Sequence, residues 1–206
     1  GGDAALADCT FSENTALSDG GGMYNHGSLT ATRCILIGNR GEYFGGGIYV
    51  SFGRPTVTAC TFRENTARYG GGMYVVGSAA TVTACMFREN KVTREGGGMY
   101  NGVYSSPTVT RCIFNGNRAT LYGGGMYNSD ASPTVSACTF SGNTAWYGGG
   151  MYNYLDSILI VIHCTFSENM ARDPFGNGTG AGGAMYNAGG SPPALTNSIL
   201  WADSPD

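Results

Sequence analysis

Cysteine recurs once every 25 to 27 residues along this chain of 206 residues. The seven positions are Cys9, Cys34, Cys60, Cys85, Cys112, Cys138 and Cys164. Each cysteine is followed by Phe or Leu two residues later, by Asn five residues later, and then by a glycine-rich segment. A period of this length, sustained over the whole chain, predicts a solenoid in which every repeat forms one coil.

Three short extended segments fit in one repeat, and Gly or Asn separates them. They are of the types Thr-Val-Thr, Cys-x-Phe and Gly-Gly-Met-Tyr, all rich in β-branched or aromatic residues. Helix is disfavoured because adjacent glycines in most repeats each cost about 1 kcal/mol relative to alanine. The sequence therefore predicts an all-β, single-stranded parallel β-helix of about seven full coils plus a partial eighth.

The repeat predicts one continuous domain over residues 1–206. Its expected repeats are 9–33, 34–59, 60–84, 85–111, 112–137, 138–163 and 164–197, followed by a partial coil, 198–206. The seventh repeat is longer because it carries an inserted loop, 172–181, before its glycine pair. We expect that loop to be a tolerated surface insertion.

Four columns of apolar residues are expected to point into the solenoid. They are a Val column (Val57, Val82, Val109, Val135, Val161), the cysteines, a Phe column (Phe11, Phe62, Phe87, Phe114, Phe140, Phe166) and a Met column (Met23, Met73, Met99, Met126, Met151, Met185). If Met points inward, the alternation of a strand turns the adjacent Tyr outward. The reverse orientation also gives a packable core.

The cysteines are expected to be free, buried thiols. Their number is odd, and one per repeat places them in a single column with a spacing of about 4.8 Å between parallel side chains. A disulfide needs converging Cβ atoms about 3.8 Å apart. A linear column of one ligand type also cannot close the tetrahedron of a structural zinc site. We therefore expect no cofactor and no metal.

Asparagine occupies the same position in all seven repeats, three residues after the Phe position. The residues are Asn14, Asn39, Asn65, Asn90, Asn117, Asn143 and Asn169. We predict a stacked ladder in which each side-chain amide bonds to the next coil. The alternative is a glycan-binding row, but asparagine at a solenoid corner commonly satisfies backbone polar groups.

The motif Phe-x-x-Asn followed by Gly-Gly-small-apolar resembles the polymorphic outer membrane protein repeat of chlamydial surface autotransporters. Here it reads Phe62-Arg63-Glu64-Asn65 with Gly70-Gly71-Gly72-Met73, and it recurs through all seven repeats, with Leu36 and Ile48 as substitutes in the second. The resemblance covers nearly the whole chain. It implies a right-handed parallel β-helix at the bacterial cell surface, with an adhesive or structural role.

Two further sets of residues are candidate contact surfaces. A tyrosine column is expected to present an aromatic stripe for lateral or glycan contacts; its members are Tyr24, Tyr49, Tyr74, Tyr100, Tyr127, Tyr152 and Tyr186. Leu6 near one end of the chain, and Ile199 and Leu200 near the other, are expected to meet in an end-to-end contact between copies. A head-to-tail contact that does not close produces a filament.

Composition and residue placement limit the functions available. The net charge of −3 argues against nucleic-acid binding, and no apolar run approaches membrane-spanning length. Asp19, Asp130, Asp156 and Asp173 fall at different positions of the repeat, unlike the clustered carboxylates of β-helix polysaccharide lyases and hydrolases. We therefore expect no enzymatic activity.

The prediction is a non-catalytic structural or adhesive β-helix, extracellular or on the cell surface. It would stack end to end with other copies of itself, or belong to a longer surface rod, and its candidate ligand is a surface glycan. One alternative is an ice-binding solenoid that uses its rows of threonine, namely Thr30 and Thr32, Thr56 and Thr58, Thr81 and Thr83, Thr108 and Thr110, and Thr134 and Ser136. A second alternative is a β-helix that binds or degrades polysaccharide.

Overall fold

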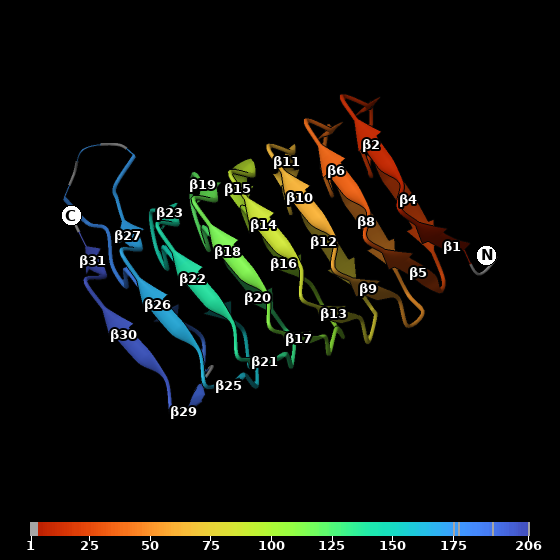
Figure 1. The fold of residues 1–206 in the computed structure, drawn as a ribbon. Coiled ribbons are helices and arrows are strands. Elements are labelled where there is room, and N and C mark those ends of the chain that lie inside the picture. Colours follow the sequence, from red (N-terminus) through yellow and green to blue (C-terminus); the bar gives the residue numbers. More distant parts are fainter. Residues whose placement is uncertain (1–3, 175, 177, 191, 206) are drawn as a thin grey trace.

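The chain winds into a parallel β-helix whose coils stack along one axis (Figure 1). The computed structural model describes residues 4–174, 176, 178–190 and 192–205. Every strand pairing in it is parallel and joins one coil to the next, which confirms the predicted fold class. Within these ranges no helix is long and apolar enough to span a membrane.

Two of the four sheets contain the Thr-Val-Thr segments and the segments that follow each cysteine. Sheet A consists of β1 (Ala4–Ala7), β5 (Leu29–Thr32), β9 (Thr56–Thr58), β13 (Thr81–Thr83), β17 (Thr108–Thr110), β21 (Thr134–Ser136), β25 (Ile160–Ile162) and β29 (Ala194–Thr196). Sheet B consists of β2 (Thr10–Ser12), β6 (Ile35–Ile37), β10 (Thr61–Arg63), β14 (Met86–Arg88), β18 (Ile113–Asn115), β22 (Thr139–Ser141), β26 (Thr165–Ser167) and β30 (Ile199–Trp201).

The other two sheets follow the asparagines and the glycines. Sheet C consists of β3 (Thr15–Ala16), β7 (Arg40–Gly41), β11 (Thr66–Tyr69), β15 (Lys91–Glu95), β19 (Arg118–Ala119), β23 (Thr144–Ala145), β27 (Met170–Ala171) and β31 (Ser204–Pro205). Sheet D consists of β4 (Met23–His26), β8 (Ile48–Ser51), β12 (Met73–Val76), β16 (Met99–Asn101), β20 (Met126–Ser129), β24 (Met151–Tyr154) and β28 (Met185–Asn187).

The prediction of three strands per repeat was wrong, because sheet C adds a fourth. Most of its strands have only two residues, too few for alternation of polar and apolar residues to be visible in the sequence. The cysteines also lie outside the strands that were predicted to contain them. Each occupies a bend immediately before a sheet B strand, and the residue before it has a left-handed backbone, with φ of 51° to 54° in the first seven coils.

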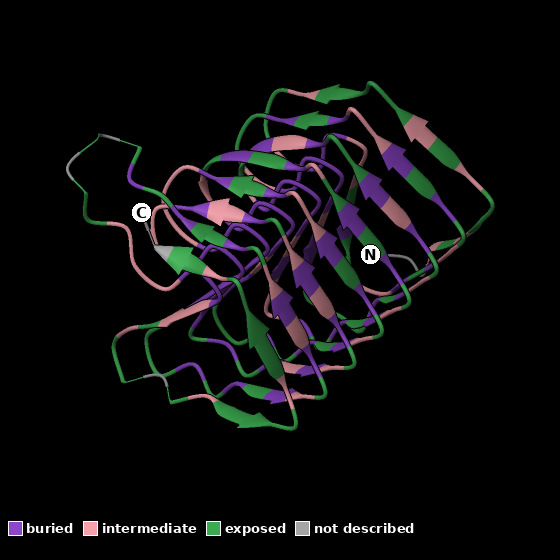
Figure 2. Cartoon of the chain, turned by 60° about the vertical axis from the view of Figure 1, so that its left-hand side comes forward, coloured by how far each residue is buried: buried purple, intermediate pink, exposed green. Residues whose placement is uncertain are grey.

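The core follows the predicted columns (Figure 2). Val82, Phe87 and Met99 are fully buried, as are their counterparts in the middle coils. Met therefore faces the interior and Tyr the outside of sheet D. A second, smaller cluster lies behind sheet C, where Ala67, Val92, Ala119 and Ala145 point inward.

The first glycine of each glycine-rich segment is required by the backbone. Gly70 has φ of +63°, and a Cβ there would lie 2.7 Å from the carbonyl oxygen of Met73. The corresponding glycines of the other repeats have φ between +63° and +71°. Left-handed backbone combined with close approach leaves no room for a side chain, which explains why this position never varies in the chain.

Candidate binding surfaces and internal ladders

The asparagines after the Phe column form an unbroken ladder along the rod. In the middle of it, the backbone N–H and the side-chain Nδ2 of Asn90 both donate to Oδ1 of Asn117, at 3.1 and 2.9 Å. The same Nδ2 also donates to the carbonyl of Phe62 in the preceding coil, at 2.9 Å. Each asparagine from Asn39 to Asn169 thus links three successive coils, and these residues are fully buried.

The ladder ends on a carboxylate. Asn169 donates its backbone N–H and its Nδ2 to Oδ1 of Asp203, both at 2.8 Å. Asp203 therefore replaces asparagine as the acceptor, but it carries an oxygen where every other member carries the Nδ2 donor. That second oxygen, Oδ2, is buried without a hydrogen-bond partner.

A second asparagine ladder lies inside sheet D, and sequence reasoning did not find it. Asn101 donates to Asn128, Asn128 to Asn153 and Asn153 to Asn187, all through Nδ2 to Oδ1, at 2.8, 2.7 and 2.6 Å. The preceding coils hold Val50 and Val75 at the same register. Oδ1 of Asn101 consequently faces an apolar neighbour and is buried without a partner.

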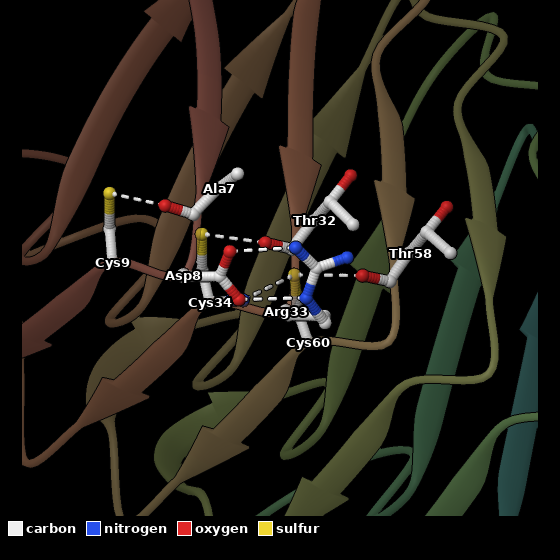
Figure 3. Close-up of polar contacts among 8 residues, drawn as sticks. All are labelled: Ala7, Asp8, Cys9, Thr32, Arg33, Cys34, Thr58 and Cys60. Carbon is white, nitrogen blue, oxygen red and sulfur yellow. Dashed lines mark hydrogen bonds and ion pairs between the residues drawn. The ribbon is translucent and has the colours of Figure 1, made fainter.

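The thiols form a third column, shown at its N-terminal end in Figure 3. The Sγ of Cys34 donates to the carbonyl of Thr32 at 3.4 Å, and the backbone N–H of Cys34 donates to Sγ of Cys60 at 3.3 Å. All seven cysteines are free. In the last coil Ser198 takes the same place and accepts from the backbone N–H of Cys164 at 3.2 Å. The thiol therefore satisfies backbone groups at the bend as well as filling space.

Exposure separates the first cysteine from the rest. Cys9, in the first coil of the described structure, is only partly buried, contrary to the expectation that all seven are buried. In the middle of the rod, the hydrogen bond with Cys112 and burial raise the pKa of the Cys138 thiol to about 12, against the opposing effect of the bond with Cys164. A thiol held protonated is a poor nucleophile, so the Cys138 thiol is chemically protected. The pKa of the Cys60 thiol is instead lowered, chiefly by its hydrogen bond with Cys85.

The tyrosine column is a continuous stack. Successive rings from Tyr24 to Tyr186 have centroids 4.6 to 5.4 Å apart and interplanar angles of 10° to 28°. Tyr24 is 56% exposed, but Tyr127 and Tyr152 are only 5% and 7% exposed. These two members present almost no surface, which corrects the idea of a uniform exposed stripe. Because the rings face one another, mainly their edges are available to a ligand.

A second tier of side chains covers the middle of this stack. It is the column immediately before the glycines, where Phe44 packs 4.7 Å from Tyr74 and Tyr122 packs 4.7 Å from Tyr152, between ring centroids. Glu95 interrupts this tier between Tyr69 and Tyr122. Burial among the rings raises the pKa of its carboxyl group, and the neighbouring Arg94 only partly opposes this.

The threonine rows of sheet A are in register over consecutive strands. Thr56 pairs with Thr81, Thr81 with Thr108, and Thr108 with Thr134. The next strand places Ile160 in the row, so the hydroxyl array ends there. His163, in the bend that follows, is exposed and contacts the side chain of Asn197 at 3.2 Å.

The end-to-end candidates lie at opposite ends of the rod. Leu6 is partly buried on the first strand of sheet A, while Ile199 and Leu200 are 62% and 48% exposed on the last strand of sheet B. Among the described residues no group of three or more His, Cys, Asp or Glu side chains is placed to hold a metal ion.

Four parallel sheets around a core of stacked identical columns define a β-helical solenoid. The family model of the right-handed β-helix region matches residues 1–100 and 56–201, and the chain belongs to that family. The sense of the winding expected from the sequence agrees with this match. Neither the curated proteins nor the solved structures contain a match to the chain.

Proposed function

We propose that the protein is a non-catalytic structural or adhesive β-helix, located outside the cell or on its surface. The motif Phe-x-x-Asn with Gly-Gly-x-Met-Tyr supports a rod of the polymorphic outer membrane protein repeat type. In this role the chain stacks end to end into a filament or forms part of a longer surface rod. Its partners are other copies of itself or further coils, and no catalytic group is required.

The observation that carries this proposal is the apolar end of the last coil. Leu195, Ile199, Leu200 and Trp201 are between 43% and 65% exposed there. A hollow of about 300 Å³ opens on the same end and is lined by Met185, Leu200 and Trp201, among others. Exposed strand edges beside apolar side chains favour pairing with another strand.

The geometry also refines how such a contact would form. Sheets A, B and C each have eight strands, whereas sheet D has seven and ends at β28. A neighbour that begins with its own β1 would continue sheets A, B and C but leave a gap of one strand in sheet D. The hollow beside Met185 lies at this gap, so the contact must either tolerate it or fill it with another segment.

Electron microscopy and sedimentation velocity of purified protein test the proposal. We expect rods longer than a single chain, and we expect Leu200→Asp to disperse them because it places an unpaired charge in an apolar junction. Ile113→Asp is the matched control, since Ile113 is an apolar residue of similar exposure, 41% against 48% for Leu200, in the middle of the rod. A protein that stays monomeric at high concentration, with both end faces covered, would refute the filament.

The register of the threonine rows favours ice binding as a second candidate function. Five consecutive strands carry a hydroxyl at the first row position, spaced regularly along the rod. A thermal hysteresis measurement tests it. Activity that disappears in Thr81→Leu/Thr108→Leu would replace the structural proposal, whereas an absence of hysteresis removes this candidate.

A further inference from the structure

Three hollows on the outer face of sheet C join into one groove along the rod. Their volumes are about 510, 320 and 500 Å³. The first and second share Thr66, Ala67 and Thr93, and the second and third share Arg118 and Thr120. We call this continuous depression, from Arg40 to Arg172, the sheet C groove.

The groove results from the shortness of the sheet C strands. In the middle coils the second residue of each strand, such as Ala67 or Ala119, points inward, so the residues on either side of it in the chain point outward. One wall is the column that contains Arg40, Thr66, Lys91, Arg118 and Thr144, which the strand register aligns coil by coil. The other wall holds Glu42, Arg68, Thr93 and Thr120.

The charge of this groove is opposite to that of the protein. Its lining contains five basic side chains, Arg40, Arg68, Lys91, Arg118 and Arg172, against two acidic ones, Glu42 and Asp173. The chain as a whole carries a net charge of −3. Charge segregated in this way attracts a ligand of the opposite sign.

The central basic groups are available to such a ligand. Arg40 is already bonded to Glu42, at 3.1 Å. Arg68, Lys91 and Arg118 are exposed, and within the described part of the chain none of them lies within ion-pair distance of a carboxylate. Three cations therefore remain unneutralised along the middle of the groove.

We propose that the sheet C groove binds a linear acidic polysaccharide, one that bears carboxylate or sulfate groups, along the axis of the rod. This inference rests on the adhesive role proposed above and names its ligand. Threonine hydroxyls at Thr66, Thr93 and Thr120 stand among the cations and can bond sugar hydroxyls. An extended polysaccharide advances by roughly one sugar for each coil rise of about 4.8 Å, so successive sugars meet successive coils.

Other polyanions fit the groove less well. Single-stranded nucleic acid binds through aromatic side chains on which its bases stack. Among the described residues, none that lines the two hollows from Thr66 to Pro174 is aromatic. An extended acidic peptide would add to the edge of a sheet. The groove instead lies over the face of sheet C, whose edges are at the two ends of the rod.

The test measures binding of an oligogalacturonate to the purified protein by calorimetry, at low and at raised salt. We expect binding that weakens as salt is added, because exposed charges are screened. Lys91→Gln/Arg118→Gln should weaken binding at least tenfold through the loss of charge-assisted hydrogen bonds. Arg54→Gln/Arg111→Gln is the matched control, because it removes the same charge from exposed sites outside the groove lining and should bind as the unmodified protein does.

Several results would overturn the inference. They are an absence of binding, an equal loss in the control variant, equally tight binding of a neutral galactan, or tighter binding of single-stranded DNA. Thermal unfolding of both variants verifies that the coils remain folded. The filament proposal rests on the apolar end of the last coil and not on these charges. A failed binding test therefore leaves the filament proposal standing, and a failed electron microscopy test leaves the binding proposal standing.

Discussion

Two asparagine ladders run through this rod, one at the bend before sheet C and one inside sheet D. The first is continuous from Asn14 to Asn169 and ends on Asp203, and each interior amide bonds to backbone groups as well as to its neighbour. The second spans only Asn101 to Asn187 and bonds from side chain to side chain. On the far side of Val50 and Val75, Asn25 is isolated and donates to the carbonyl of Gly27.

The difference shows what makes a polar column indispensable. Each asparagine of the bend ladder follows a residue of left-handed conformation. Its backbone N–H donates to the side-chain oxygen of the next member of the ladder, which is Asp203 in the case of Asn169. Inside sheet D the strand pairing already satisfies the backbone hydrogen bonds. Valine can therefore replace asparagine there, provided that neighbouring coils carry valine at the same position, as Val50 and Val75 do. A buried hydrogen-bonded pair costs little stability when both members are present, and also when both are replaced by apolar groups. It costs much when only one member is removed, because the other then stays buried without a partner.

Breaking the bend ladder is expected to have the largest effect. Asn117→Ala leaves the backbone N–H and Nδ2 of Asn90 without an acceptor and the carbonyl of Phe87 without its side-chain donor. We expect a loss of about 3 kcal/mol in the free energy of unfolding, since each unsatisfied buried group costs about 1–3 kcal/mol. Urea denaturation measures it, with Asn115→Ala on the outer face of sheet B as the control. Equal losses at the two sites would show that the ladder is solvated.

Within sheet D, two substitutions of the same kind should differ. Asn128→Val leaves Nδ2 of Asn101 without an acceptor and Oδ1 of Asn153 without a donor, which should cost about 2 kcal/mol. Asn101→Val only moves the orphaned oxygen by one coil, to Asn128, and should be neutral within about 0.5 kcal/mol. Similar costs for the two variants would contradict the view that missing partners decide the outcome.

Repairing the end of the bend ladder should stabilise the protein. Asp203→Asn restores the amide donor that the other members direct at the carbonyl of the preceding coil, here that of Phe166 by analogy with Asn169 and Phe140. The expected gain is about 1 kcal/mol, the net worth of one hydrogen bond. Asp203→Ala removes the acceptor of Asn169 and should lower stability. A melting order other than Asn above Asp above Ala would contradict this reading.

Glu95 extends the comparison to a half-buried acid that belongs to neither ladder, and here we expect the smallest effect. Because burial raises the pKa of its carboxyl group in the folded state, ionisation is disfavoured by folding, and stability falls as the pH rises through that pKa. Glu95→Gln should therefore melt higher than the unmodified protein at pH 7, and the difference should vanish in acid below the ordinary value of 4.5. Thermal melts over this range, with Glu13→Gln as the control, measure it. A gain that persists in acid would point to packing instead.

The regular part of the fold could be predicted because each core column repeats without exception or with close substitutes. The spacing of the repeat alone aligns Phe62, Phe87 and Phe114 in one column. The same argument failed where the repeat is broken or very short. Val50 and Val75 interrupt the second asparagine column, and two-residue strands such as Thr144–Ala145 show no period at all.

The candidate surfaces were less predictable than the core. The sequence left open whether Met or Tyr faces the core, and the structure places Tyr on the outside of sheet D. The covering of Tyr152 by Tyr122 depends on a neighbouring column whose identity changes from coil to coil. The sheet C groove was not predicted, because its cations, such as Lys91 and Arg118, alternate with threonine along the rod and form no run in the sequence. Only the stacking of coils brings them to one face.

The tyrosine stack also has an optical consequence. Seven phenol rings with centroids no more than 5.4 Å apart are close enough for excitation of one ring to pass to the next. The indole of Trp146 lies 5.1 Å from Tyr147, whose ring is 5.2 Å from that of Tyr186. Light absorbed by tyrosine along the rod should therefore emerge as tryptophan emission, and separating the coils should restore tyrosine emission. The ratio of tyrosine to tryptophan emission therefore reports whether the coils are stacked.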